Sequence, residues 1–488
     1  LIELRREIEA LEACDTALSI KGNLPEGWIA RGEAMLYLLR FAESLSAYNQ
    51  AAKLSPQTTD GWEGQAKALH GLKRHQDAAR AYEQLLKIDP DFPIAKGALV
   101  HQKLLACDWS GLAAIEQSIH EDVRAGKAVV DPFVYQAIAR SAEDLKRCAQ
   151  IFVTKKYSVP QLAHDVRYAH DKIRIGYVSG EFRQHATSVL MARLFELHDK
   201  NRFELFAFDN GIDDGSELRQ RINAAFDRII DIRRLSDVKA ASEIKRNEID
   251  ILINLNGFPG EARNGVFGYR PAPIQVNYIG FAGTLGADYM DYIVADRYVI
   301  PADEMDCYVE KIAYLPDTYQ VNDSRRRIAD RAPMRSEVML PEDGFVFCSF
   351  NFNYKIMPDW FDIWMRILAS VDGSVLWLLE DNEDASRNLR NEAKRRSIDP
   401  ARLVFAPRLN LAGHLARHQL ADLFLDTLPC CAHTTASDAL WAGLPVLTCL
   451  GTTFPRAGCG KPAQRDRHVR TGHALAGRLR SACGAVGS

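Results

Sequence analysis

Several features are missing from this 488-residue sequence, and each absence excludes a class of protein. Its longest apolar runs, such as Val375–Leu379 and Leu444–Leu450, fall far short of the ~20 residues that cross a bilayer, so we expect no membrane span. A net charge of −3, from 61 Lys and Arg against 64 Asp and Glu, argues against a nucleic-acid or membrane-surface binder. No signal peptide opens the chain, because Leu1–Glu12 is charged and helical in pattern; since it starts in mid-pattern, we expect residues before it.

Cysteine is scarce as well. The ten cysteines lie at irregular spacings without a C-x-x-C pair, which is too sparse for a disulfide scaffold. Cys430 and Cys431 are adjacent, and neighbouring cysteines rarely ligate one metal. We therefore expect a cytoplasmic protein without a metal site. The hydrophobic share of 47% is ample for real cores, and the length suggests about three domains.

A 34-residue repeat occupies the front of the chain. Small, aromatic and aliphatic residues recur in register, and Pro closes the second helix of each unit. The matching sets are Ala13 with Ala47 and Ala81, Cys14 with Tyr48 and Tyr82, Ile20 with Leu54 and Ile88, Trp28 with Trp62, Ala34 with Ala68, and Pro56 with Pro90. This pattern is typical of tetratricopeptide repeats, which pair antiparallel helices, so residues 1–100 are predicted to form a helical solenoid. A concave solenoid binds extended peptides, which predicts a protein or peptide partner.

Residues 101–170 stay helical in pattern but lose the repeat, and we interpret them as a connector. Short apolar runs then alternate with amphipathic helices, which predicts two doubly wound lobes at 171–330 and 331–453. The predicted strands are Ile173–Val178, Phe203–Phe208, Ile229–Ile232, Ile249–Leu255, Ile274–Ile279 and Tyr292–Ala295, then Phe345–Phe350, Val375–Leu379, Leu403–Ala406, Leu423–Leu425 and Pro445–Cys449. The predicted fold class is therefore a tetratricopeptide solenoid followed by two Rossmann-like lobes, which resemble the GT-B architecture.

The strongest chemical signal follows the strand that ends at Leu425. A helix is predicted to open near His433, with Thr434 and Thr435 as caps. Free N–H groups at a helix N-terminus form an anion site, which suits a diphosphate. Asp438 lies one turn further on, where its carboxylate could accept hydrogen bonds from ribose hydroxyls. The alternative is ordinary capping with a solvated Asp.

Two weaker signals follow the first strand of each lobe. Lys355 lies at the carboxyl edge of the second sheet, where open α/β sheets bind ligands, and could neutralise charge on a departing nucleotide diphosphate. His185 follows the first strand of the first lobe, and a His that faces a cleft can exchange a proton near neutral pH. A solvated Lys and a structural His are the alternatives.

Residues 171–453 resemble the catalytic region of protein O-GlcNAc transferases, especially bacterial members. The motifs that carry the resemblance are Ile175–Ser179, Arg270–Gln275, Met290–Tyr292, Tyr354–Ile356, Val375–Leu379, His433–Thr435 and Leu440–Gly443. The resemblance implies an inverting, metal-independent transferase without cofactor, which moves N-acetylglucosamine from UDP-GlcNAc to Ser or Thr hydroxyls of proteins.

The resemblance also assigns roles to individual residues. His185 matches a general base or acceptor-orienting group, and Lys355 matches the lysine on the diphosphate. Asn351, Cys430, His433, Thr434 and Thr435 belong to the donor-binding set, Asp438 to the ribose contact, His414 and Arg417 to the surroundings of uridine, and Leu409 and Leu411 to the border of the base. Animal members carry Gln at the position of Phe352 and Lys at that of Leu411, so another UDP-sugar is an alternative donor.

The segment 454–488 departs from the family pattern. Its six Arg and one Lys against one Asp give it a charge of +6, it shows no helical or strand period, and we predict it to be disordered. A nucleic-acid arm is one interpretation, and a changed reading frame or truncation is the one we favour. If the second lobe is incomplete, the chain is alternatively a tetratricopeptide interaction scaffold with an inactive transferase domain.

Overall fold

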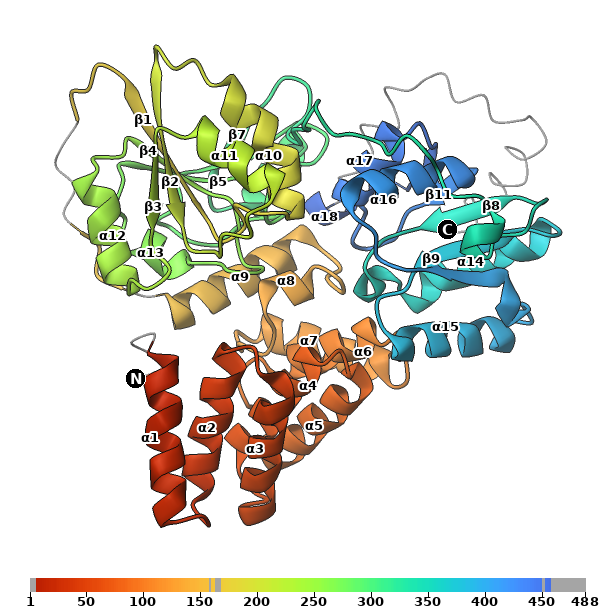
Figure 1. Cartoon of the computed structure of the whole chain (residues 1–488), viewed down its shortest axis with the longest axis horizontal. Helices are drawn as coiled ribbons and strands as arrows, with labels where there is room; N and C mark the ends of the chain where they lie inside the picture. Colours follow the sequence, from red (N-terminus) through yellow and green to blue (C-terminus); the bar gives the residue numbers. More distant parts are fainter. Residues whose placement is uncertain (1–5, 158, 163–167, 450–452, 458–488) are drawn as a thin grey trace.

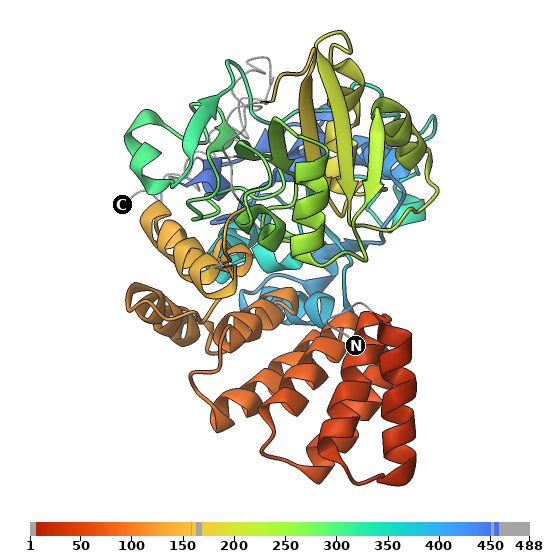
Figure 2. The same cartoon turned by 90° about the vertical axis from the view of Figure 1, so that its left-hand side faces the viewer.

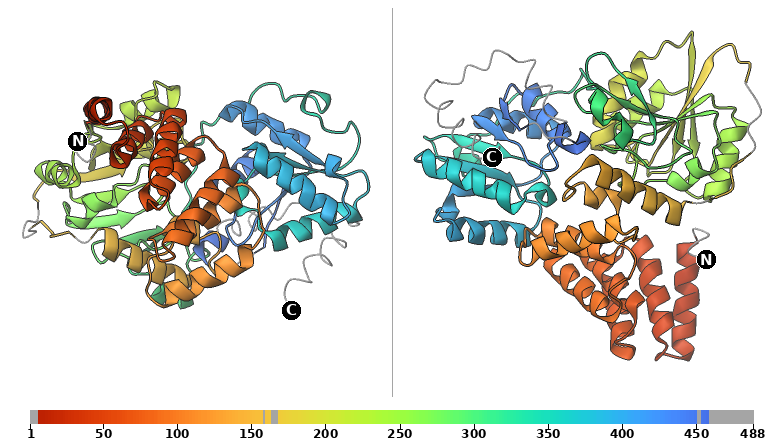
Figure 3. Two further views of the ribbon diagram at one scale, coloured as in Figure 1. Left: turned by 90° about the horizontal axis from the view of Figure 1, so that it is seen from below. Right: turned by 180° about the vertical axis from the view of Figure 1, so that it is seen from behind.

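The computed structural model describes residues 6–157, 159–162, 168–449 and 453–457. A helical array forms one end of the molecule, and two α/β lobes lie side by side at the other (Figures 1 and 2). Seen from below, the array and the connector helices lie under both lobes (Figure 3). No helix in the described ranges is both long and apolar enough to cross a membrane.

The array consists of antiparallel helices that follow the predicted repeat. They are α1 (Glu7–Ile20), α2 (Pro25–Tyr37), α3 (Phe41–Leu54), α4 (Thr59–Gly71), α5 (His75–Ile88) and α6 (Ala95–Leu105). The repeated alanines Ala34, Ala47, Ala68 and Ala81 are buried, which lets neighbouring helices approach closely. The ring of Tyr48 fills the space beside Gly64, where an added Cβ would lie only 2.0 Å from it. The predicted solenoid is therefore confirmed.

The connector joins the array to both lobes. Helix α6 runs through the predicted boundary at residue 100, and α7 (Leu112–Arg124), α8 (Pro132–Tyr135) and α9 (Ala142–Lys156) follow it. Phe152 of α9 belongs to the core of the first lobe, whereas Cys107 belongs to the core of the second. Because one helical segment contributes to both cores, it fixes the lobes relative to the array.

The first lobe contains a seven-stranded parallel sheet in the order β3-β2-β1-β4-β5-β6-β7. Its strands are β1 (Ile173–Ser179), β2 (Phe203–Asp209), β3 (Arg228–Asp231), β4 (Ile251–Asn254), β5 (Ile274–Asn277), β6 (Tyr292–Ala295) and β7 (Lys311–Tyr314). Helices α10 (Ala186–Leu197) and α11 (Glu217–Ala225) pack on one face, and α12 (Asp237–Arg246), α13 (Asn264–Gly268) and α9 pack on the other. The edge strand β7 was not predicted, because its four residues form no buried apolar run.

The second lobe contains a five-stranded parallel sheet in the order β10-β9-β8-β11-β12. Its strands are β8 (Val346–Ser349), β9 (Val375–Leu379), β10 (Leu403–Ala406), β11 (Leu423–Leu425) and β12 (Val446–Leu447). Helices α14 (Pro358–Ser370) and α15 (Glu383–Arg395) cover one face, while α17 (Thr434–Trp441) packs on the other and α16 (Leu411–Arg417) follows β10. Short 3₁₀ turns lie at Ala302–Cys307, Ser336–Val338, Asn353–Lys355, Pro400–Arg402 and His418–Leu420. Together the two lobes confirm the predicted GT-B-like fold.

The chain order reverses at one place in each sheet, between β1 and β4 in the first and between β8 and β11 in the second. At such a switch point the loops after the two central strands diverge, and ligands of open α/β sheets bind there. The loops that carry Lys355 and His433 both leave the second switch point, and the loop that carries His185 leaves the first.

The segment 454–488 differs from its prediction where it is described. Residues Phe454–Ala457 form the short helix α18, which lies between the lobes in Figure 1. Phe454 is buried and packs against Tyr319 of the first lobe, and the N–H of Cys431 donates to the carbonyl of Pro455 at 2.8 Å. The rest of the predicted disordered segment lies outside the described residues.

Candidate functional site

Lys355 lies at the second switch point, in the 3₁₀ turn Asn353–Lys355. Its Nζ donates to the carbonyl of Cys431 at 2.8 Å, in the loop that leads from β11 into α17. Tyr354 beside it is buried against His101 of α6, with ring centroids 5.8 Å apart. The connector therefore supports the turn, and the ammonium group lies at the entrance to α17.

A chain of hydrogen bonds joins the two loops of this switch point. The hydroxyl of Thr435 donates to Asn351 Oδ1, Asn351 Nδ2 donates to Thr427 Oγ1 at 2.9 Å, and that hydroxyl donates to the carbonyl of Cys430 at 2.8 Å. Asn351 and Thr427 are buried, and burial also raises the pKa of the Cys430 thiol. Asn351 and Cys430 thus act in the structure as supports of the loop.

Asp426, directly after β11, holds the backbone of the same loop near its start and near its end. Its Oδ1 accepts from the N–H groups of Thr427 and Ala432, both at 2.7 Å, and its Oδ2 accepts from the hydroxyl of Thr448 at 2.6 Å. A carboxylate that accepts several bonds in a buried place holds the backbone rigidly. The path from β11 to α17 is therefore set by side chains on both sides.

The N-terminus of α17 differs from the prediction in one respect. Its N-cap residue is His433, without a side-chain cap, so Thr434 and Thr435 are the first helical residues and do not cap the helix. The imidazole instead contacts the first lobe, because its Nδ1 lies 2.6 Å from the hydroxyl of Tyr319. Burial, together with the nearby charge of Lys355, lowers the pKa of His433 to about 3, so the ring is neutral at pH 7. The first N–H groups of a helix lack intrahelical partners and can bind an anion.

Asp438, one turn into α17, is held by an arginine from the segment between the lobes. Arg326 Nη1 lies 2.5 Å from Asp438 Oδ1, and the guanidinium stacks 4.7 Å from the ring centroid of Trp441. Burial raises the pKa of Asp438 to about 6, and Arg326 opposes this rise. The second oxygen, Oδ2, lies 3.8 Å from His414 Nε2. The predicted ribose contact is thus a buried carboxylate with one oxygen already occupied.

The residues predicted around the uridine divide into a buried and an exposed group. Arg417 is buried, stacks 4.1 Å from the centroid of Phe350 and donates to the carbonyl of Pro407 at 2.7 Å. Its Nη2 lies 2.5 Å from Nδ1 of His414, whose pKa is lowered to about 2, mainly by burial. Leu409 is exposed, and Leu411 packs against the core of the first lobe. Arg417 is therefore held within the second lobe, where it contacts His414.

His185 is the N-cap of α10 at the carboxyl edge of the first sheet. Its Nδ1 accepts the N–H of Thr187 at 3.3 Å and lies 3.7 Å from Oε2 of Glu181. Its surroundings lower its pKa, chiefly through burial, which Glu181 opposes, although 43% of the side chain remains exposed. Within the described ranges it forms no hydrogen bond or ion pair with the second-lobe site residues.

Sequence reasoning missed the residues that link the lobes. Tyr319, Asn322 and Arg326 come from the irregular stretch that follows β7, which the sequence placed in the first lobe without any predicted element or site residue. Their partners on α17 lie more than a hundred positions away: 114 for Tyr319–His433 and 112 for Arg326–Asp438. The only local signal was the run of three arginines that begins at Arg325.

Comparisons with known proteins agree with this geometry. The model of glycosyl transferase family 41 matches residues 134–332 and 329–457. A probable UDP-N-acetylglucosamine–peptide N-acetylglucosaminyltransferase SEC of Arabidopsis thaliana is 36% identical over 330 residues, which cover 65% of this chain and 33% of that protein. The UDP-N-acetylglucosamine–peptide N-acetylglucosaminyltransferase of Caenorhabditis elegans is 28% identical over 426 residues, which cover 64% of this chain and 37% of that one.

This chain therefore spans about a third of the length of the curated relatives that it matches. Among solved structures, a mutant of the Thermobaculum terrenum O-GlcNAc transferase superposes with a TM-score of 0.69 at 23% identity, over 99% of this chain and 93% of that one. That likeness concerns the fold. Since the family model covers most of both lobes, the chain belongs to glycosyl transferase family 41.

Proposed function

We propose that this chain transfers N-acetylglucosamine from UDP-GlcNAc to Ser or Thr hydroxyls of proteins, with inversion at the anomeric carbon and without a metal ion. The observation that carries the proposal is the position of the Lys355 ammonium at the entrance to α17, on the switch point of a parallel sheet. Family membership supports the reaction class, and the names of the relatives support the donor and acceptor.

In this proposal the second lobe binds the donor. The diphosphate accepts hydrogen bonds from the first N–H groups of α17 at Thr434 and Thr435, where the helix dipole favours negative charge. Lys355 lies beside this entrance and neutralises the charge that grows on UDP as it leaves. Asp438 accepts from a ribose hydroxyl through the oxygen that Arg326 does not occupy.

The acceptor hydroxyl attacks the anomeric carbon from the side opposite to UDP. Its oxygen forms the new bond as the bond to the phosphate oxygen breaks, and its proton leaves. His185 is predominantly neutral at pH 7 and its Nδ1 accepts from the N–H of Thr187, so the ring proton lies on Nε2, which donates to the acceptor oxygen and orients it while the hydroxyl proton passes to solvent. The general-base alternative requires the other tautomer, in which the bond from Thr187 is broken and Nε2 accepts the proton. A lysine and helix N–H groups supply the stabilisation that many transferases obtain from a divalent cation.

The test replaces Lys355 with Ala and measures both transfer and binding. We expect Lys355→Ala to abolish transfer and to reduce the stabilisation by UDP, which for the wild type reaches about 2.7 kcal/mol at a hundred times its Kd. Lys146→Ala is the matched control, because Lys146 Nζ also donates to a backbone carbonyl, at 2.6 Å, on the remote helix α9. Unchanged UDP stabilisation in Lys355→Ala would contradict the proposal.

The same titration separates the enzyme from an interaction scaffold with an inactive domain. A wild-type chain that UDP does not stabilise favours the scaffold, whereas one that UDP stabilises favours the transferase. A different donor sugar is a second candidate, and the observation behind it is Phe352, which is 45% exposed with Arg408 5.0 Å from its ring. Mass spectrometry of the product distinguishes the sugars.

A further inference from the structure

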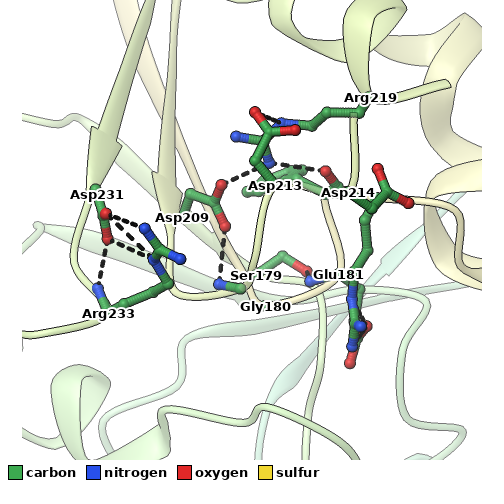
Figure 4. Close-up of polar contacts among 12 residues, drawn as sticks. Ser179, Gly180, Glu181, Asp209, Asp213, Asp214, Arg219, Asp231 and Arg233 are labelled. Carbon is green, nitrogen blue, oxygen red and sulfur yellow. Dashed lines mark hydrogen bonds and ion pairs between the residues drawn. The ribbon is translucent and has the colours of Figure 1, made fainter. Parts of the chain in front are cut away.

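A buried carboxylate faces the ring of His185 at the carboxyl edge of the first sheet. Glu181 is buried in the loop after β1, and its Oε2 lies 3.7 Å from Nδ1 of His185. In the described part of the chain, no other carboxylate lies within ion-pair distance of that ring. Figure 4 shows Glu181 beside the other carboxylates of this edge, which have partners of their own. They are Asp209 and Asp213, which pair with Arg219, Asp214, which accepts the N–H of Gln184, and Asp231, which pairs with Arg233.

The fold holds the Glu181 carboxylate in place. Arg183 donates to its Oε2 through Nε at 3.2 Å and through Nη2 at 3.0 Å. The backbone of Gly260, at a φ of +63°, packs so closely against the other oxygen that an added Cβ would lie 2.5 Å from Oε1. The carbonyl of Glu181 accepts the hydroxyl of Ser188 on α10. Because His185 is the N-cap of α10, this bond keeps the carboxylate and the imidazole in one unit.

The imidazole of His185 is held less firmly. Its side chain is 43% exposed, and the N–H of Thr187 donates to Nδ1 at 3.3 Å, longer than the usual ~2.7–3.2 Å. An N–H group in the first turn of a helix has no intrahelical partner and can bond to water instead. A small rotation of the ring therefore replaces Thr187 by Glu181 at Nδ1 and leaves the freed N–H satisfied.

The two partners of Nδ1 fix opposite tautomers of the ring. The N–H of Thr187 needs a lone pair on Nδ1, so the ring proton then lies on Nε2. A carboxylate needs the proton on Nδ1, which leaves the lone pair on Nε2. A hydrogen bond to an ionised carboxylate is stronger than one between neutral groups. Glu181 therefore favours the form of His185 in which Nε2 is a base.

Arg183 opposes this effect, because it occupies the same carboxylate oxygen. The pKa of His185 is lowered by burial, while the charge of Glu181 raises it and that of Arg183 lowers it. Arg183 also lines the cavity of about 1360 Å³ between the array and the first lobe, so its side chain has room to move away. The two members of one ion pair thus act on the ring in opposite directions.

We propose that Glu181 is a positioning residue for His185, whose carboxylate accepts the Nδ1 proton and so makes Nε2 the base for the acceptor hydroxyl. The proposal rests on the proposed function and decides between the two roles that it gives His185. The O–H bond of the acceptor breaks as Nε2 takes the proton, and the oxygen bonds to the anomeric carbon while UDP leaves with the electron pair of the broken bond. Glu181 keeps its charge and stabilises the imidazolium that forms.

The experiment reads the tautomer directly, so it does not depend on transfer. Long-range ¹H–¹⁵N correlation spectra of the full chain with ¹⁵N-labelled histidine distinguish a protonated from an unprotonated ring nitrogen, at about pH 8 where the ring is neutral. The spectrum of H185N identifies the His185 signals. The test variants are E181Q and R183Q. The matched control is D231N, which breaks another carboxylate–arginine pair two residues apart at the same sheet edge.

We expect E181Q and R183Q to change the ring in opposite directions. E181Q should shift the tautomer ratio about three- to tenfold toward the Nε2–H form, because a neutral amide accepts more weakly and its N–H₂ group can donate to Nδ1. R183Q should shift it at least about twofold toward the Nδ1–H form, because it releases Oε2. The pKa of His185 should fall in E181Q and rise in R183Q. D231N should change neither quantity.

An ion pair with a merely structural role predicts the same direction for both variants, since both break it. Shifts in one direction, shifts opposite to those expected, or shifts no larger than in D231N would overturn the proposal.

Transfer rates show whether Glu181 acts through His185. E181Q should lower the rate at least about tenfold while UDP stabilisation stays unchanged, but should lower it less than about twofold in an H185N background. Equal losses in both backgrounds would also overturn the proposal. A wild-type chain that UDP does not stabilise would instead contradict the proposed function, whatever the spectra show.

Discussion

The pairing of Arg326 with Asp438 offers a quantitative test of how the segment between the lobes supports the proposed donor site. The Arg326 side chain is 1% exposed and that of Asp438 is 8% exposed, so Arg326→Met leaves a carboxylate buried without its partner. Breaking a buried pair in this way costs about 3–5 kcal/mol. The pKa of Asp438 is raised to about 6 by burial even though Arg326 opposes the rise, so removing Arg326 should raise it further and we expect the carboxyl to be largely protonated at pH 7. Proton uptake relieves part of the cost, and we expect a loss of about 3 kcal/mol.

Urea unfolding followed by tryptophan fluorescence measures this loss. A double-mutant cycle of Arg326→Met and Asp438→Asn should give a coupling free energy of about 2 kcal/mol or more, because the double variant leaves no buried charge unpaired. The control is Arg331→Met, which removes an exposed arginine of the same segment whose pair with Glu337 is 72% and 41% exposed. It should cost less than about 0.5 kcal/mol.

The affinity for UDP supplies a second readout with a defined sign. In Arg326→Met the protonated Asp438 accepts ribose hydrogen bonds poorly at pH 7, so we expect about tenfold weaker binding. A carboxyl with a raised pKa ionises when the pH rises, so the deficit should be smaller at pH 9 than at pH 7. A variant as stable as the wild type, or one whose UDP deficit grows from pH 7 to pH 9, would refute the reasoning.

Three further predictions concern other parts of the molecule. His418 is fully buried, and its pKa is lowered to about 4. Below about pH 6.5 the unfolded chain therefore takes up a proton that the folded chain does not, which destabilises the fold. Urea unfolding at pH 7 and pH 5 should show the wild type losing about 2 kcal/mol of stability relative to His418→Gln. Thr435→Val removes the hydroxyl that donates to Asn351 and should weaken UDP binding about fivefold in calorimetry, and an unchanged Kd would contradict the support role of that bond. Gly64→Ala places a methyl group against the Tyr48 ring and should cost about 1–3 kcal/mol in thermal unfolding, with equal stability as the contrary result.

The sequence was sufficient for the elements that repeat or alternate regularly. The 34-residue period predicted the array because each unit must bury the same small and aromatic face, as Ala47 and Tyr48 do. Buried strands such as Val375–Leu379 were visible as continuous apolar runs. The edge strand β7 was not visible, because its four residues are exposed or only partly buried.

The sequence predicted which edge of the sheet carries the loops of the site, but not the exact path of those loops. That Lys355 and the 433–435 turn share one sheet edge followed from the rule that loops after parallel strands meet there. That His433 is the cap, and that Thr435 donates to Asn351, depended on the exact path of a loop that Asp426 holds from its own start and Asn351 holds from the neighbouring loop.

By itself, the sequence determined the solenoid, the two doubly wound lobes and the loops at the carboxyl edge of the second sheet, because local periodicity and the order of the strands are properties of the chain itself. Only the tertiary structure decided that Arg326 holds Asp438, that Tyr319 holds His433, and that the array and the first lobe enclose a large cavity. These features join residues more than a hundred positions apart or different domains. They arise from the packing of whole lobes, which buries a charge or leaves it unpaired regardless of its neighbours in the sequence.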